Sequence, residues 1–117
     1  MFLQLKHQKL DVYTITRSFV IENYKITKQF PSDERFCITQ QIRRAALSVY
    51  FNLAEGCSRK SVQERNRYFE VSRGSIIEID AVFDIAVDLG YCSKEDLVDL
   101  SNFGARSFSM ICKMIKK

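Results

Sequence analysis

Long stretches of this chain contain no residue that breaks a helix. Its 117 residues include four glycines and one proline, and these few breakers sit mainly between long stretches of periodic apolar residues. A sheet-rich chain would need a turn about every eight to twelve residues, usually built from glycine or proline. The scarcity of both therefore favours a small number of long helices.

Apolar residues recur at helical spacing in four stretches. The third stretch is the most regular, because its inward-facing residues alternate steps of three and four, as in a coiled-coil seam. These residues are Phe69, Ser72, Ile76, Ile79, Phe83 and Ala86. The expected helices span about residues 8–28, 33–55, 62–89 and 94–116, within a single domain of residues 1–117.

Polar and small residues mark the expected helix ends. Phe30-Pro31 ends the first helix, because the residue before proline is pushed out of the α region. Ser32 is the expected N-cap of the second helix and Gly56 its C′ residue. The second helix is thus expected to run from the proline to the glycine without a break.

The third and fourth helices have capping signals of their own. Ser61 and Glu64 match the S-x-x-E capping box, Gly90 stops the third helix, and Ser93 with Asp96 begins the fourth. All three connections are short, and short connections join antiparallel neighbours. We therefore expect an all-α, up-down-up-down antiparallel four-helix bundle.

The second helix is apolar on two sides. One stripe faces the expected core and comprises Ile42, Ala45, Ala46, Val49 and Leu53. Leu47 and Phe51 lie on the opposite side, where a surface helix should be polar. A loop or the N-terminal tail, a second copy of the chain, or a different protein would have to cover them. We favour self-association, because an uncovered apolar patch promotes aggregation.

Arg44 and Glu55 lie on the same outer side of this helix. They are too far apart in sequence to pair within one helix, but they could pair across a subunit contact. The alternative is that both are solvated. The expected subunit interface comprises Arg44, Leu47, Phe51 and Glu55.

No set of catalytic or metal-ligating residues is apparent. The single histidine, His7, lies in the N-terminal stretch, and no Glu-x-x-His, HExxH or Cys/His zinc pattern occurs. Asp80, Asp84 and Asp88 share a helix face that could bind a divalent cation, but a solvated acidic face is the simpler interpretation. We expect no enzymatic activity, no metal and no cofactor.

The cysteines and the absence of a membrane segment indicate the compartment. Four cysteines without a CxxC motif are typical of reduced thiols in a cytosolic protein. The N-terminus lacks the apolar core of a signal peptide, and no apolar run approaches the ~20 residues that span a bilayer. We expect a soluble, cytoplasmic protein with no membrane partner.

Basic residues concentrate around the connection between the second and third helices, while the end of the third helix is acidic. Arginine-rich surfaces often bind phosphate. Solvated arginines are an equally good interpretation, and a net charge of +4 permits a polyanion without requiring one. The candidate nucleic-acid-binding residues are Arg43, Arg44, Arg59, Lys60, Arg67 and Arg73.

Several motifs follow one another along the chain, namely Phe30-Pro31, residues 41–46 (QIRRAA), 52–56 (NLAEG), Arg59-Lys60-Ser61, and Gly74-Ser75 followed by Glu78. Together they resemble the 23S rRNA intervening-sequence protein family. The usual pattern has isoleucine where Leu53 stands here, and an acidic-Leu-Glu run in place of residues 77–80. Both are mild departures in a match that covers nearly the whole chain.

This resemblance implies a four-helix bundle that assembles into a ring, typically a homopentamer, without catalytic activity. The family also resembles the accessory variability determinant of diversity-generating retroelements, a basic pentameric barrel that engages nucleic acid and a reverse transcriptase. The leading hypothesis is therefore a non-catalytic, ring-forming accessory protein that binds RNA or DNA, with a reverse transcriptase or other protein as a further partner. The alternative is a protein-binding scaffold with no nucleic-acid role.

Overall fold

The protein is all-helical throughout the residues that the structure describes. The computed structural model describes residues 2–3, 5–6 and 10–117, so His7 and the first residues of the expected helix 8–28 lie outside these ranges. The helices are α1 (Asp11–Thr27), α2 (Ile38–Ser58), α3 (Val62–Asp88) and α4 (Val98–Met114), with short 3₁₀ turns at Ser32–Glu34 and Glu95–Leu97. The predicted all-α class with four long helices is confirmed.

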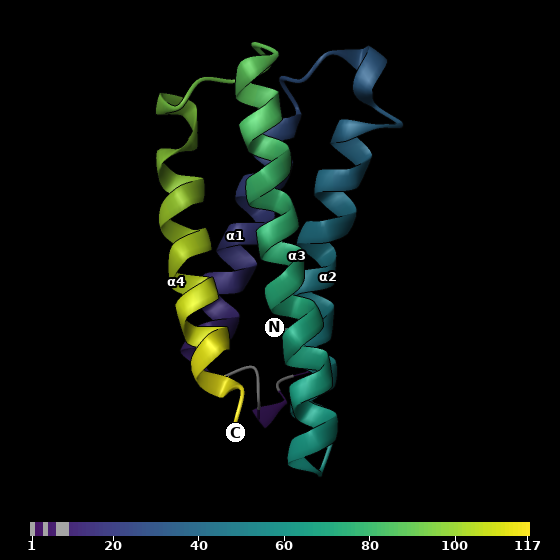
Figure 1. The fold of residues 1–117 in the computed structure, drawn as a ribbon, viewed down its shortest axis with the longest axis vertical. Coiled ribbons are helices and arrows are strands. Elements are labelled where there is room, and N and C mark those ends of the chain that lie inside the picture. Colours follow the sequence, from purple (N-terminus) through teal and green to yellow (C-terminus); the bar gives the residue numbers. More distant parts are fainter. Residues whose placement is uncertain (1, 4, 7–9) are drawn as a thin grey trace.

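The four helices form an antiparallel bundle of 44 × 29 × 25 Å (Figure 1). Packing between α2 and α3 is the most extensive, followed by α1 with α4 and α1 with α2. The α3–α4 pair packs least of the four adjacent pairs. Helices α2 and α4 therefore lie diagonally opposite, and the bundle is tight on one side and loose on the other.

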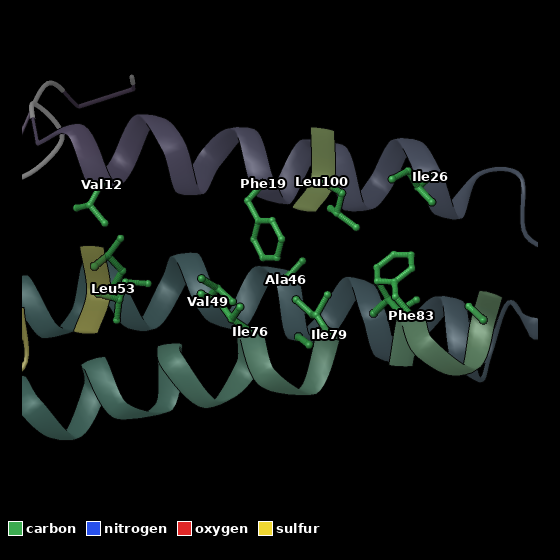
Figure 2. Packing of buried hydrophobic residues seen from close by; sticks show 14 of the residues in the cluster. Val12, Phe19, Ile26, Ala46, Val49, Leu53, Ile76, Ile79, Phe83 and Leu100 are labelled. Carbon is green, nitrogen blue, oxygen red and sulfur yellow. The ribbon is translucent and has the colours of Figure 1, made fainter. Parts of the chain in front are cut away.

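The core-facing stripe of α2 is buried as predicted. Ile42, Ala46, Val49 and Leu53 have no exposed surface. Figure 2 shows Val12, Phe19 and Ile26 of α1 pointing at residues of α2, α3 and α4 across the core. The third-helix seam is also buried, and Ser72 within it donates a hydrogen bond from Oγ to the Val49 carbonyl oxygen at 2.7 Å.

The second helix begins later than predicted. Ser32–Glu34 forms a separate 3₁₀ turn, the backbone breaks at Cys37, and α2 starts at Ile38. The physical reason is an anchor across the end of the bundle. The Phe30 ring packs against those of Phe83 and Tyr91, and the Tyr91 hydroxyl donates to the Glu34 carboxylate at 2.7 Å. This anchor holds the segment away from the α2 axis.

The second helix also ends later than predicted, because Gly56 is not its C′ residue. The helix continues through Gly56 to Ser58 and ends where Arg59 becomes extended. Gly56 is required for close packing instead. A Cβ atom added there would lie 2.5 Å from Cε1 of Phe69, whose ring is buried. The glycine therefore lets α2 approach α3.

The ends of α3 follow the sequence signals more closely. Gly90 has a φ of +79°, the left-handed conformation that glycine adopts most easily, and it follows the last turn of α3.

Ser93 and Asp96 exchange backbone-to-side-chain hydrogen bonds at 3.0 and 3.2 Å, and the Ser93 N–H lowers the Asp96 pKa. This pair caps a 3₁₀ turn, so the fourth helix begins at Val98 and not at residue 94.

The α3 N-cap provides a test of the local energetics. The Ser61 hydroxyl accepts a hydrogen bond from the Glu64 N–H at 3.1 Å. We expect Ser61→Ala to lower the free energy of unfolding by about 1 kcal/mol, because the N–H loses its partner. Urea denaturation measures this. Ser58→Ala is the matched control, because the Ser58 hydroxyl only donates to a carbonyl of its own helix. Equal effects for the two variants would contradict the capping role.

Candidate nucleic-acid interface

Arg65 fixes the geometry of the α2–α3 turn. Its Nη1 donates to the carbonyl oxygens of Cys57 and Arg59 at 3.4 and 3.3 Å, and its guanidinium lies over the Phe69 ring. The last carbonyls of a helix have no partner within the helix itself. Arg65 therefore closes the end of α2 from the first turns of α3.

Arg59 is held by two neighbours in the same chain. Its Nη2 donates to Glu55 Oε2 at 3.1 Å and to the Tyr68 hydroxyl at 2.9 Å, and the guanidinium lies over the Tyr68 ring. Tyr68 and, to a lesser degree, Glu55 raise the Arg59 pKa, so the group stays charged. Glu55 thus has a partner within its own chain, four residues away.

Three of the candidate cations remain exposed. Arg44, Lys60 and Arg67 project from α2, the turn and α3, respectively. None of the three forms a hydrogen bond or ion pair with another described residue, apart from contacts within the helical backbone. They are therefore available to a ligand outside the chain.

Arg43 and Arg73 are not brought together with the other candidates. The Arg43 Nε donates to Thr27 Oγ1 at 2.9 Å, and its guanidinium lies over the Tyr24 ring, so it joins α2 to α1. The Arg73 guanidinium lies over the Phe108 ring and faces α4. The predicted cluster of six is thus divided among three sides of the bundle.

Sequence reasoning missed the lysines at the end of the chain. Asn66 accepts from the Lys116 N–H at 3.0 Å and donates to the Lys116 carbonyl oxygen, so the C-terminal segment is tied to the start of α3. The C-terminus and the α2–α3 turn lie at the same end of the bundle (Figure 1). We call this end the basic pole and define it by Arg59, Lys60, Arg65, Arg67, Lys113, Lys116 and Lys117.

The basic pole also contains a shallow hollow of about 540 Å³. Its walls combine cationic side chains with apolar ones. They include Arg65, Lys113, Lys116, Val62, Phe69 and Met110. The up-down-up-down topology alone places the end of the fourth helix beside the start of the third, and that signal could have identified these lysines.

The outer side of α2 is left open in the single chain. Phe51 is 57% exposed, and Leu47 is half-buried. Tyr50 turns away from them and packs edge-on against Tyr13, with ring centroids 5.6 Å apart. No described loop covers Phe51. We call Arg44, Leu47 and Phe51 the outer stripe of α2.

The structure describes no metal-binding arrangement. In residues 2–3, 5–6 and 10–117, no three His, Cys, Asp or Glu side chains are placed to hold a metal ion together, and this includes the face of Asp80, Asp84 and Asp88. The four cysteines are free thiols, and burial raises the pKa of Cys92. Within the same described ranges, none of the helices has the length and apolar character needed to cross a membrane.

Comparison with known proteins identifies the family. The model of the family described as 23S rRNA-intervening sequence protein matches residues 8–116. The chain belongs to this family. A crystal structure of a protein of unknown function from the S23 ribosomal protein family of Bacteroides thetaiotaomicron has the same fold. Its TM-score is 0.81 at 16% identity, over 91% of this chain and 99% of that one. No curated protein matches the chain.

Proposed function

We propose that this member of the 23S rRNA-intervening sequence protein family is a non-catalytic, oligomeric accessory protein that binds RNA or DNA through its basic pole. The observation that carries the proposal is the gathering of cations from three chain segments at one end of the bundle. Lys60 and Arg67 are exposed there, and Lys116 is tied beside α3 by Asn66. Such a surface suits the phosphate backbone of a nucleic acid.

Self-association strengthens this surface. Phe51 and Leu47 are apolar and lie open on the outer side of α2, where a second copy of the chain would cover them. Family resemblance favours a ring of five subunits. A ring repeats the basic pole in each subunit, so weak phosphate contacts add through effective concentration. Cytoplasmic location and a protein partner such as a reverse transcriptase belong to the same proposal.

Contacts with phosphate should dominate binding, because an all-helical surface offers no aromatic sheet for stacking bases. We expect Lys60→Gln with Arg67→Gln to weaken binding of every RNA sequence about equally. The log–log slope of affinity against salt should flatten by about 0.7 to 0.9 for each phosphate group that the variant no longer neutralises. Fluorescence anisotropy of a labelled single-stranded RNA, titrated at several salt concentrations, measures both effects.

Charge-matched and assembly controls separate this effect from others. Lys28→Gln with Arg35→Gln removes the same charge at the opposite end of the bundle and should leave the slope unchanged. Light scattering confirms that each variant keeps its mass. If the two double variants weaken binding equally, or if the Lys60/Arg67 variant weakens binding of only some RNA sequences, the basic pole is not the phosphate-binding surface.

One observation favours the alternative of a protein-binding scaffold. Arg43, Arg59 and Arg73 are occupied by contacts with Thr27, Tyr68 and Phe108. These arginines stabilise the subunit under either hypothesis, and the scaffold hypothesis needs no phosphate ligand. Failure of the unmodified protein to bind RNA or duplex DNA at about 50 mM salt would leave the scaffold as the function.

A further inference from the structure

The loose side of the bundle contains a second open surface. A groove of about 1140 Å³ runs between α3 and α4. Its lining combines an apolar floor with acidic side chains along α3. We call it the α3–α4 groove, and it includes Ile77, Asp80, Asp84, Val98, Ala105 and Phe108. Ile77 and Val98 are exposed, although both are large and apolar.

We infer that the α3–α4 groove receives the outer stripe of α2 from a neighbouring copy, so that the subunits join head to tail. This inference rests on the proposed self-association and assigns its second face. The stripe lies on α2, which is diagonally opposite α4 and contributes no residue to the lining of the groove, so the stripe cannot fill the groove of its own chain. A contact between two different faces is heterologous, and it closes into a ring when its rotation permits.

Charge complementarity favours this pairing over a contact of the stripe with itself. The stripe contains Arg44, whose guanidinium needs a carboxylate once it is buried. Glu55 is the carboxylate on the same side of α2, but it already pairs with Arg59 at 3.1 Å. The groove presents Asp80 and Asp84. A neighbouring copy therefore offers the carboxylate that the stripe lacks.

The heights of these residues along the bundle also agree. The hydrogen bond between Ser75 Oγ and Ser48 Oγ, at 2.9 Å, places these two residues at the same level. Arg44 then lies about 6 Å from that level and Asp80 about 7.5 Å, in the same direction, at 1.5 Å per residue. In a ring whose axis runs along the bundle, residues at equal heights meet, so Arg44 faces Asp80.

The apolar residues fall into the same register. Leu47 and Ile77 lie about 1.5 and 3 Å from the Ser48–Ser75 level, on the same side as Arg44. Phe51 lies on the other side of that level, near the height of Arg73, whose guanidinium covers Phe108. The register thus opposes Leu47 to Ile77, Phe51 to the Arg73–Phe108 pair, and Arg44 to Asp80.

Charge reversal tests the pair directly. We expect Arg44→Asp alone and Asp80→Arg alone each to reduce the mass measured by light scattering to that of one subunit. The double variant should recover the full mass, because the reversed charges again meet across the contact. Glu78→Arg is the matched control, since it reverses an exposed carboxylate of the same helix two residues from Asp80 but outside the lining of the groove, and it should keep the full mass.

Mixing two broken proteins tests whether the contact joins two different faces. Phe51→Asp breaks the stripe and Ile77→Asp breaks the groove, so each protein alone should be a single subunit. Mixed together they should form a dimer through the one intact stripe and the one intact groove. An Ile77→Asp protein that keeps its full mass would overturn this inference while leaving self-association intact. Unmodified protein with the mass of one subunit would overturn both.

Discussion

Phe51→Asp is expected to convert the oligomer into folded single subunits. The Phe51 ring is 57% exposed in the single chain, so replacing it should change the subunit's free energy of unfolding by no more than about 0.5 kcal/mol. In the assembly the new carboxylate would be buried in an apolar contact. Loss of a central aromatic residue typically costs at least ~2 kcal/mol of binding free energy, and a buried charge adds to this.

Phe36→Asp is the control for that experiment. Phe36 is also an exposed aromatic residue, at 77%, but it lies in the connection before α2 and outside the outer stripe. It should keep the full mass in light scattering, while Phe51→Asp falls to the mass of one subunit. Circular dichroism should show the same helical content for both. Dissociation by both variants would mean that exposed aromatic residues in general, and not this stripe, hold the subunits together.

Gly56→Val is expected to destabilise the subunit itself by about 2 to 3 kcal/mol, because it overpacks the core. Even the first added atom would lie 2.5 and 2.7 Å from two carbons of the Phe69 ring. That ring is 1% exposed and is covered by Arg65, so it has little room to move. Relief would require α2 and α3 to separate, and they are the most extensively packed pair of helices in the bundle.

Gly74→Ala provides the opposite result in the same fold. Gly74 lies inside α3, and nothing stands within 4 Å of an added Cβ. Alanine should therefore raise the free energy of unfolding by about 0.5 to 1 kcal/mol through its better helix propensity. Urea denaturation of both variants measures the contrast. A gain in stability from both variants would show that propensity alone, and not the Phe69 contact, determines the role of Gly56.

Helix number, order and inner faces could be predicted from the sequence because they depend on local periodicity. The buried stripe of Ile42, Ala46, Val49 and Leu53 follows from 3.6-residue spacing. The Ser61 cap and the Gly90 stop depend on a few adjacent residues. These features needed no knowledge of which helices pack together.

Features that depend on tertiary packing were not predicted correctly. Glycine is the residue type that most often ends a helix, and only the closeness of the Phe69 ring shows that Gly56 serves helix packing instead. Ser32 is of a residue type that favours the N-cap position, but the Tyr91–Glu34 hydrogen bond across the bundle holds residues 32–34 in a separate turn before α2. A local rule fails where a residue distant in sequence supplies the stronger interaction.

The candidate site was predicted in part for the same reason. Lys60 and Arg67 are exposed near the turn, as their position in the sequence indicated. Arg43 and Arg73 were included because they flank the basic connection between the second and third helices in the sequence. In the structure each faces a different neighbouring helix. Lys116 is held beside the site by hydrogen bonds with Asn66, fifty residues away. The groove depends on how loosely α3 and α4 pack, and no sequence period encodes that looseness.

Sedimentation velocity of the unmodified protein with a fluorescently labelled single-stranded RNA, at about 50 mM salt and micromolar protein, tests the central claim most directly. One experiment reads the mass of the protein particle and shows whether RNA travels with it. The account predicts that labelled RNA sediments with a particle of several subunits and is released as salt rises. RNA that sediments alone beside the protein, or that travels with a single subunit, would contradict it.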